Sequence, residues 1–299
     1  MTTDATSDSF EIPAGHTGHE IVFPLGRRSE QAAATAAEAE GAARMAEPCR
    51  GCFAHGTCQV ARLLQLADRQ MPVTDRQTPT RWLYTRSLAR GEHVFYAGDE
   101  QEAVYVVKSG SVKTWLTSAS GPEPVLGFHL AGDMLGFEAL GTRVQSCSAT
   151  ALENSVVCVL PLLQFEALIN RTRGAFRWFL DVTGRIFADH QAAFAMLGRT
   201  RAEVRLGCFL LDLSRRYRER GFSGRQFNLP MSRQDISKHL GLAQETLSRL
   251  MAHLEQDGVI SAERRRITIL NPLALERLAR QSGARVDRLN YAPDKRKSA

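Results

Sequence analysis

Residues 228–270 carry the pattern that most constrains the fold, because helix signals alternate there with a glycine break and a basic turn. Ser232 is a good helix N-cap, and Asp235 follows three residues later at the positive end of that helix. Gly241 ends this helix, and a second one is expected from about Ala243 to Gln256. Two short strands around three arginines follow. Helix, tight glycine turn, helix and basic hairpin together predict a winged helix-turn-helix.

The charge distribution is consistent with a nucleic-acid partner for this module. The chain carries a net charge of +6, but residues 200–299 alone hold 20 Lys/Arg against 11 Asp/Glu, a balance of +9. Neutralising phosphates supplies most of the affinity for nucleic acids, so a basic C-terminal third is typical of a protein that binds them. A solvated surface with scattered arginines would show the same excess, so charge alone leaves both interpretations open.

The second predicted helix presents Glu245, Ser248 and Arg249 on one face, opposite its leucines. They lie in its N-terminal half, the part that enters the major groove in helix-turn-helix proteins. Arginine can donate two hydrogen bonds to guanine, glutamate can accept one from cytosine, and serine can do either. Any surface helix has a polar face, but the basic hairpin and the charge balance favour double-stranded DNA. Phosphate contacts are expected from Arg233, Lys238, Gln244, Thr246, Arg264, Arg265 and Arg266.

The middle of the chain divides into a β-rich part and a helical part. Residues 79–163 alternate apolar and polar positions between recurring glycines, which predicts a small β-barrel or roll. The turn at 108–111 predicts a hairpin. Residues 164–220 switch to helical spacing and carry an apolar stripe that includes Phe176 and Phe187. Such a stripe packs either within its own chain or against a second copy, and we expect a homodimer.

Three of the six cysteines form a C-x2-C-x5-C group: Cys49, Cys52 and Cys58. The first two thiolates can hold one metal centre and the third can close over it, so a fourth ligand would come from Cys147, Cys158 or Cys208. Such thiolates suit zinc or an iron–sulfur cluster. His55 could serve as a zinc ligand, so a zinc site is still possible, and a thiol–disulfide switch is a third option. The spacing does not choose the metal.

Other classes of protein find little support in the sequence. The longest apolar stretch, Val156 to Leu163, contains Pro161 and is far shorter than the roughly 20 residues of a membrane helix. No secretory signal is expected, so we predict a cytoplasmic protein with reduced thiols. The motifs GxSxG, GxGxxG and HExxH and the P-loop do not occur in the sequence, and no enzymatic activity is expected.

From about Cys49 to Leu278, the chain resembles the Fnr type of Crp/Fnr transcription regulators, the oxygen-sensing branch. The motifs that carry the resemblance are the cysteine group, AGDE at 97–100, GFHLAGD at 127–133, ALE at 151–153 leading to VC at 157–158, LSRR at 213–216, and GL at 241–242 through ET at 245–246 with SR at 248–249. The resemblance implies an α+β fold with a β-roll like that of cyclic-nucleotide-binding proteins, a long dimerisation helix and a C-terminal winged helix-turn-helix.

The expected domain organisation follows from these segments. The predicted parts are a disordered arm at 1–48, the cysteine loop and β-roll at 49–170, a dimerisation helix at 171–200, the DNA-binding domain at 201–280 and a basic tail at 281–299. Within the arm, the stretch Gln31–Glu40 could form a transient helix but lacks large apolar residues to bury, and the arm receives no role.

The resemblance further implies a [4Fe–4S] cluster held by four cysteines. The fourth follows the Ala-Leu-Glu motif, which selects Cys158 beside Cys49, Cys52 and Cys58. Cys147 and Cys208 then remain as packing thiols. It also implies that the anaerobic, cluster-bound dimer binds DNA and that oxygen disassembles the cluster and lowers DNA binding.

The base-contacting pattern Glu-x-x-Ser-Arg of this family falls on Glu245, Ser248 and Arg249. It implies a palindrome resembling TTGAT-N4-ATCAA. Activation of transcription would need contact with RNA polymerase, which in this family uses exposed loops of the roll, here near residues 117–123.

A regulator that binds a cyclic nucleotide shares this architecture. Such a site needs an arginine facing the cyclic phosphate, and Gln145 stands at that place, which argues against a cyclic nucleotide ligand. Arg143 lies close enough to keep the possibility open. The alternative is therefore a Crp-type regulator that senses another small ligand or a redox state through the roll, with zinc or free thiols at the cysteines.

Overall fold

The computed structural model describes Cys49, Cys52, Ala54 and residues 56–68, 83–117, 123–199 and 201–280, with only the backbone described for 192–199. The arm at 1–48, the tail at 281–299, His55 and most of the loop at 117–123 lie outside the described residues. None of the described helices is long and apolar enough to cross a membrane.

The N-terminal half is a roll of two four-stranded sheets. The first has the order β1-β8-β3-β6 and the second β2-β7-β4-β5. The strands run over Tyr84–Leu88 (β1), His93–Phe95 (β2), Ala103–Ser109 (β3), Ser111–Trp115 (β4), Val125–Leu130 (β5), Met134–Leu135 (β6), Ser148–Ala151 (β7) and Ser155–Pro161 (β8), with a 3₁₀ turn at Glu138–Leu140. The predicted β-roll is therefore confirmed.

The hairpin predicted at 108–111 is wrong. β3 and β4 follow each other through Gly110, but β3 pairs with β6 and β8 while β4 pairs with β5 and β7. The turn therefore carries the chain from one sheet to the other. Gly110 has φ +78, and a Cβ there would collide with Ser155 and the carbonyl of Asn154. Glycine is needed at this crossing because the two sheets approach closely.

The two central strands of the first sheet, β3 and β8, are buried on both faces. Because side chains alternate along a strand, Val104 and Val106 of β3 face outward toward helices, whereas Tyr105 and Val107 face the interior of the roll. Because both faces are buried, the sequence of β3 contains a continuous apolar run and does not alternate between apolar and polar residues.

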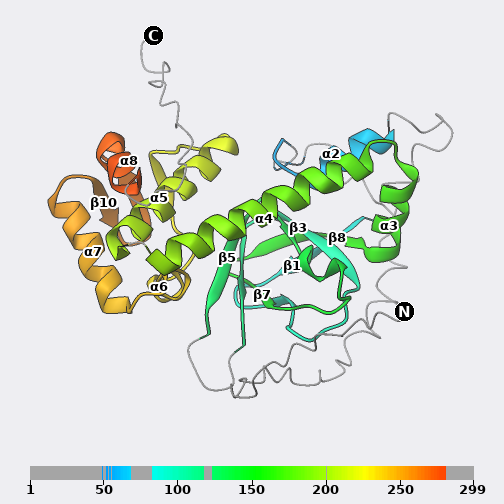
Figure 1. Ribbon diagram of the computed structural model, residues 1–299, viewed down its shortest axis with the longest axis horizontal. Helices are drawn as coiled ribbons and strands as arrows, with labels where there is room; N and C mark the ends of the chain where they lie inside the picture. Colours follow the sequence, from blue (N-terminus) through cyan, green and yellow to red (C-terminus); the bar gives the residue numbers. More distant parts are fainter. Residues whose placement is uncertain are drawn as a thin grey trace, which may run out of the picture.

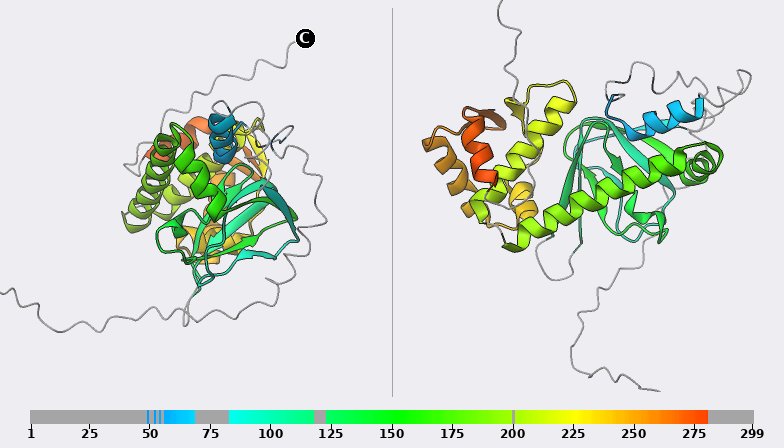
Figure 2. Two further views of the ribbon diagram at one scale, coloured as in Figure 1. Left: turned by 90° about the vertical axis from the view of Figure 1, so that its right-hand side faces the viewer. Right: turned by 45° about the horizontal axis from the view of Figure 1, so that its top comes forward.

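Three helices follow the roll or cover it. α2 (Gln59–Asp68) precedes the strands, α3 (Leu162–Arg171) follows β8, and α4 (Ala175–Arg199) runs the length of the roll toward the C-terminal domain (Figure 1). In the two views of Figure 2, α2 lies beside the N-terminal part of α4, and the two helices share one apolar cluster with the first sheet.

The apolar stripe of α4 divides into two faces. Trp178 and Val182 are buried against the roll, so part of the stripe packs within its own chain. Phe176, Leu180 and Phe187 are 66%, 49% and 62% exposed. Their spacing of four and seven residues places them on one side of the helix.

The C-terminal domain is a winged helix-turn-helix, as predicted. It consists of α5 (Ala202–Glu219), β9 (Gln226–Asn228), α6 (Arg233–Leu240), α7 (Gln244–Gln256), β10 (Ile260–Glu263), β11 (Arg266–Ile269) and α8 (Pro272–Arg280). Ser232 and Asp235 cap α6 reciprocally, and Gly241 ends it at φ 62 in the left-handed region. The structure adds β9 to the wing, a strand of three residues that periodicity does not reveal.

The two domains share an interface along β5. Val125 and Phe128 of this strand are part of the apolar core of the C-terminal domain. His239 of α6 contacts the Val125 carbonyl oxygen through Nδ1 at 3.1 Å, and Lys113 Nζ of β4 lies 2.5 Å from Asp235 Oδ1. The first helix of the helix-turn-helix is therefore docked on the roll.

Candidate functional site

The cysteine segment is a tight loop that leads directly into a helix. The Ala54 carbonyl oxygen accepts hydrogen bonds from the backbone N–H groups of Thr57 and Cys58, at 3.1 and 2.8 Å. The N–H of Ala61 donates to Cys58 Sγ at 3.3 Å, so this thiol lies at the start of α2, where backbone N–H groups are unpaired. Local hydrogen bonding therefore orients Cys58 independently of any ligand.

A fourth cysteine reaches this loop from the roll. Cys158 lies on β8 opposite Thr85 of β1 and Val106 of β3. Because side chains alternate along β8, Cys158 points to the outer face covered by α2, whereas its neighbours Val157 and Val159 point into the roll. One small cavity is lined by four thiols and mainly apolar neighbours: Cys49, Cys52, Cys58, Cys158, Ala54, Val60, Ala61, Leu83, Val106, Val107 and Lys108.

Three thiols of this cavity, those of Cys49, Cys58 and Cys158, are hard to ionise by themselves. Burial, reinforced by the other thiols, raises the pKa of Cys49 to about 11 and that of Cys158 to about 12, while Lys108 acts weakly in the opposite direction. Burial also raises the pKa of Cys58, against hydrogen bonds from the backbone of α2. Thiolates in this cavity therefore need a cationic centre to stabilise them. In the described part of the chain, no three His, Cys, Asp or Glu side chains form a ready site for a single ion.

The other two cysteines lie elsewhere. Cys147 is 2% exposed in the core between the two sheets, and its Sγ donates to Glu138 Oε1 at 3.3 Å. Cys208 lies on α5, and its Sγ is 3.7 Å from the carbonyl oxygen of Ala279. Neither lines the thiol cavity. Of the three candidates for a fourth thiol, the structure brings only Cys158 to the other three.

Neither of the two residues considered for a cyclic phosphate, Gln145 and Arg143, presents a guanidinium group to the interior of the roll. Gln145 is 1% exposed, and its amide oxygen has no hydrogen-bond partner among the described residues. Arg143 instead pairs with Glu166 of α3, and half of its side chain is exposed. Arg143, which had kept the possibility of a cyclic nucleotide ligand open, is therefore engaged in an ion pair on the outside of the roll.

The outer face of α7 is exposed and already ordered. Glu245 and Arg249 are 76% and 79% exposed at the side chain and form an ion pair of 2.7 Å between Oε1 and Nη2. Ser248 Oγ donates to the carbonyl oxygen of Gln244 at 3.0 Å. Leu247, Met251 and Leu254 are buried on the opposite face and fix the orientation of the helix.

The residues expected at phosphates fall into two groups. Gln244 and Thr246 are exposed at the start of α7. Arg264 and Arg265 form the turn of the wing, with Arg264 at φ 55, and Arg266 begins β11. By contrast, Lys238 Nζ lies 3.4 Å from Glu123 Oε2 of the roll. Arg233 is half-buried, and its Nη1 has no hydrogen-bond partner among the described residues. Lys238 is therefore engaged by the roll in this conformation rather than presented beside α7.

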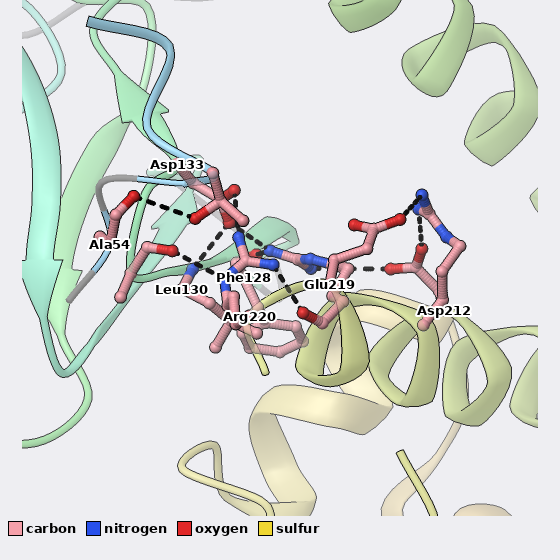
Figure 3. A network of polar contacts seen from close by, with 11 residues as sticks. Ala54, Phe128, Leu130, Asp133, Asp212, Glu219 and Arg220 are labelled. Carbon is pink, nitrogen blue, oxygen red and sulfur yellow. Dashed lines mark hydrogen bonds and ion pairs between the residues drawn. The ribbon is translucent and has the colours of Figure 1, made fainter. Parts of the chain in front are cut away.

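Sequence reasoning gave no role to a second polar contact between the domains. Asp133, in the turn between β5 and β6, accepts hydrogen bonds from Arg216 of α5 and from Arg220, the residue that caps the C-terminus of α5 (Figure 3). Asp133 and Arg216 each belong to a segment that carries the family resemblance, but the sequence does not reveal that the two segments meet. Only the opposite charges of Asp133 and Arg216, in two of the motifs that carry the resemblance, could have suggested it.

Two family descriptions match the two domains. Residues 85–172 match the cyclic nucleotide-binding domain, and residues 204–278 match the Crp-like helix-turn-helix domain. Together they cover the roll and the winged helix, including α6 and α7.

Characterised relatives cover most of the chain. It is 34% identical over 242 residues to the fumarate nitrate reduction regulatory protein of Klebsiella oxytoca, covering 78% of this chain and 93% of the relative. It is 39% identical over 194 residues to the transcriptional activator protein Anr of Pseudomonas protegens, covering 65% and 80%. Among solved structures, FixK2 from Bradyrhizobium japonicum matches with a TM-score of 0.61 and 27% identity, over 66% of this chain and 96% of that one.

Proposed function

Because the chain belongs to the Fnr and Anr type of the Crp/Fnr superfamily of DNA-binding transcription regulators, we propose that it controls transcription in response to oxygen. The observation that carries the proposal is the single cavity lined by four thiols from two distant segments of the chain. A regulator acts where the DNA is, so we place it in the cytoplasm, whose reducing conditions keep such thiols available.

We infer that Cys49, Cys52, Cys58 and Cys158 hold a [4Fe–4S] cluster. The donor set fits this group, since iron–sulfur clusters are held by four cysteine thiolates and the cavity offers four thiols among apolar neighbours. When bound, the cluster supplies a reaction with oxygen that destroys it. The raised pKa values of Cys49 and Cys158 mean that these thiols return to the neutral form when no cation faces them.

The cysteines act on the dimer through α2 in this proposal. Val60, Leu63 and Leu64 of α2 are buried in the same apolar cluster as Trp178 and Val182 of α4. Linking the cysteine loop to Cys158 holds α2 against the first sheet. Because α2 also packs against α4, this link stabilises the position of α4. Releasing the loop removes this support.

We propose that α4 forms a homodimer through its exposed stripe. Phe176, Leu180 and Phe187 present large apolar side chains to solvent on one side of the helix, and a second copy would cover them. Dimerisation matters because each chain contacts only one half-site. The recognition helices of a dimer enter successive major grooves, about 34–36 Å apart.

We propose that Glu245, Ser248 and Arg249 contact base edges of a palindrome resembling TTGAT-N4-ATCAA. Arg249 can then donate to guanine O6 and N7, which requires exchanging its ion pair with Glu245 for the base. Both side chains are largely exposed, so this exchange costs little. Contacts of Gln244, Thr246 and the wing arginines with phosphates would position the helix without specifying the sequence.

Contact with RNA polymerase through the loop near 117–123 completes the proposal. Of this loop, only residue 117 and residue 123 are described, and Glu123 pairs with Lys238 of the DNA-binding domain. Activation therefore rests on the resemblance to activators of this type.

The test is DNA binding to that palindrome, with anaerobically purified and air-exposed protein. We expect wild type to bind tightly only without oxygen. Cys158→Ala abolishes both the tight binding and the response to oxygen, while Cys147→Ala, whose thiol lies outside the cavity, behaves as wild type. Anaerobic protein that contains no iron and no acid-labile sulfide would contradict the proposal. A Cys147→Ala variant that behaves like Cys158→Ala would overturn the choice of ligand.

A further inference from the structure

The turn between β5 and β6 touches the cysteine loop on one side. Gly132 has φ +96, and a Cβ at this position would collide with the hydroxyl group of Thr57. Thr57 itself is fixed, because its Oγ1 donates to the Ala54 carbonyl oxygen at 3.2 Å. The turn and the residue preceding Cys58 are therefore in direct contact, and only glycine permits this approach.

The same turn is clamped to the wall of the thiol cavity. The N–H of Gly132 donates to the Val107 carbonyl oxygen at 2.7 Å, and the N–H of Val107 donates to the Asp133 carbonyl oxygen at 3.0 Å. Val107 lines the cavity, and the residue before it, Val106, lies opposite Cys158. A shift of the cysteine loop or of β3 at Val107 therefore displaces the turn.

On its other side, the turn holds the DNA-binding domain through charges. Asp133 Oδ2 accepts from Arg216 Nη2 at 2.5 Å, and Oδ1 accepts from Arg220 Nη2 at 2.6 Å. The two arginines also donate to backbone carbonyl oxygens of the roll, Arg216 to Phe128 at 2.6 Å and Arg220 to Ala131 at 2.7 Å. Figure 3 shows Asp133 between Ala54 of the cysteine segment and Arg220 at the C-terminal end of α5.

These ion pairs are well shielded, unlike most charged contacts on a surface. The side chains of Arg220, Arg216 and Asp133 are 5%, 18% and 28% exposed. Burial alone would raise the pKa of Asp133, but Arg216 and Arg220 keep it below its ordinary value, so the carboxylate is charged near neutral pH. Removing this charge would leave two guanidinium groups inadequately paired in a nearly closed site, which is strongly unfavourable.

We propose that the β5–β6 turn transmits the state of the cysteine loop to the DNA-binding domain, with Asp133 as the positioning residue for α5. The route runs from Thr57 to Gly132, through Asp133 to Arg216 and Arg220, and along α5 to the helix-turn-helix that packs on it. It acts within one chain and is separate from the dimer helix. The identification of oxygen as the signal rests on the proposed function. The mechanical coupling between the cysteine loop and α5 does not depend on it.

The first test is amide hydrogen exchange on the full chain, measured in the protein as purified. Thr57→Phe places a larger side chain against Gly132 and should raise exchange about tenfold or more in residues 212–220 of α5, as well as in the cysteine loop. Asp133→Asn should raise exchange in residues 212–220 by itself, and adding Thr57→Phe should then change that region no further. Glu123→Gln, which removes the separate ion pair with Lys238, is the matched control and should leave the response to Thr57→Phe intact.

The second test measures DNA affinity and iron content together. Asp133→Asn should keep the iron and sulfide of anaerobic wild type, while the ratio between its anaerobic and air-exposed affinities for the palindrome falls toward one. An Asp133→Asn protein that keeps the wild-type ratio, or a Thr57→Phe protein whose exchange rises only in the cysteine loop, would overturn the coupling. Wild-type protein without iron and sulfide would instead refute oxygen sensing, and the exchange measurement would still decide the coupling.

Discussion

The thiol cavity and the outer face of α7 assemble their functional side chains in opposite ways. On α7, three polar residues within five positions share a face because the helix repeats every 3.6 residues, and all of them are exposed or nearly so. In the cavity, Cys158 meets Cys58 although 100 positions separate them, and both are shielded from water. The α7 face is determined by local sequence, whereas the thiol cavity exists only once the roll has folded.

This difference teaches where each site is vulnerable. A change on α7 should alter what the protein binds and leave the fold intact, since the exposed side chains support nothing beneath them. A change at the cavity should alter whether the protein binds, because its walls belong to the core that carries α2 and α4. The following variants test that contrast.

The largest effect is expected at the cavity. Cys158→Ser should remove essentially all iron and sulfide from anaerobic protein, because a cluster needs four thiolates and no fifth cysteine of the described residues lines this cavity to replace Cys158. Iron and sulfide analysis with the visible absorption spectrum measures it. Cys208→Ser, on α5, is the control and should retain both. Equal loss in the two variants would contradict a site defined by the fold.

The next effect concerns the helix between the two sites. Phe187→Glu places a charge on the exposed stripe of α4, and burying that charge between two copies costs several kcal/mol. We expect the dissociation constant of the dimer to rise about 1,000-fold, as measured by analytical ultracentrifugation. Arg177→Glu, on the same helix but 82% exposed and paired with Asp181, should change it far less. An unchanged dimer in Phe187→Glu would show that this stripe is not the interface.

A smaller effect is expected on α7. Arg249→Ala should reduce discrimination between the palindrome and a variant with its guanine replaced by about 1–3 kcal/mol, the value of a bidentate contact with a base. Competition binding at fixed salt measures it, and the melting temperature and the slope of affinity against salt should change little. A variant that loses binding to all sequences equally would place Arg249 at a phosphate instead.

The smallest effect concerns the start of α6, where local and tertiary contacts overlap. Ser232→Ala removes the N-cap hydrogen bond to the N–H of Asp235, which should lower the free energy of unfolding by about 1 kcal/mol. Burial opposes ionisation of Asp235, but its bonds with Lys113 and Ser232 lower its pKa. The stability that this carboxylate contributes is therefore present above its ordinary pKa of 3.8 and is lost as the pH falls through the lower folded value. Asp235→Asn should flatten that part of the profile of denaturation midpoint against pH.

Much of the fold could be predicted because it has local signatures. The caps of α6, the buried leucines of α7 and the regular glycines of the roll all act within a few residues of where they stand. The prediction at Gly110 failed for a related reason. A turn glycine between two strands looks the same whether those strands pair with each other or belong to separate sheets, and only the long-range pairing of β3 with β8 and of β4 with β7 decides it.

By itself, the sequence determined the helix-turn-helix, the order of roll and helices, and the residues of the α7 face, because helical and strand periodicity place side chains on faces without reference to the rest of the chain. The spacing of the cysteines left open which thiol joins the C-x2-C-x5-C group, and only the family resemblance pointed to Cys158. The tertiary structure supplies the physical reason, since the alternation along β8 and the covering α2 bring Cys158 there and leave Cys147 inside the roll. It also decided that Asp133 meets Arg216 and Arg220. Contacts between segments more than 80 residues apart depend on how the two domains pack, and no local pattern encodes that.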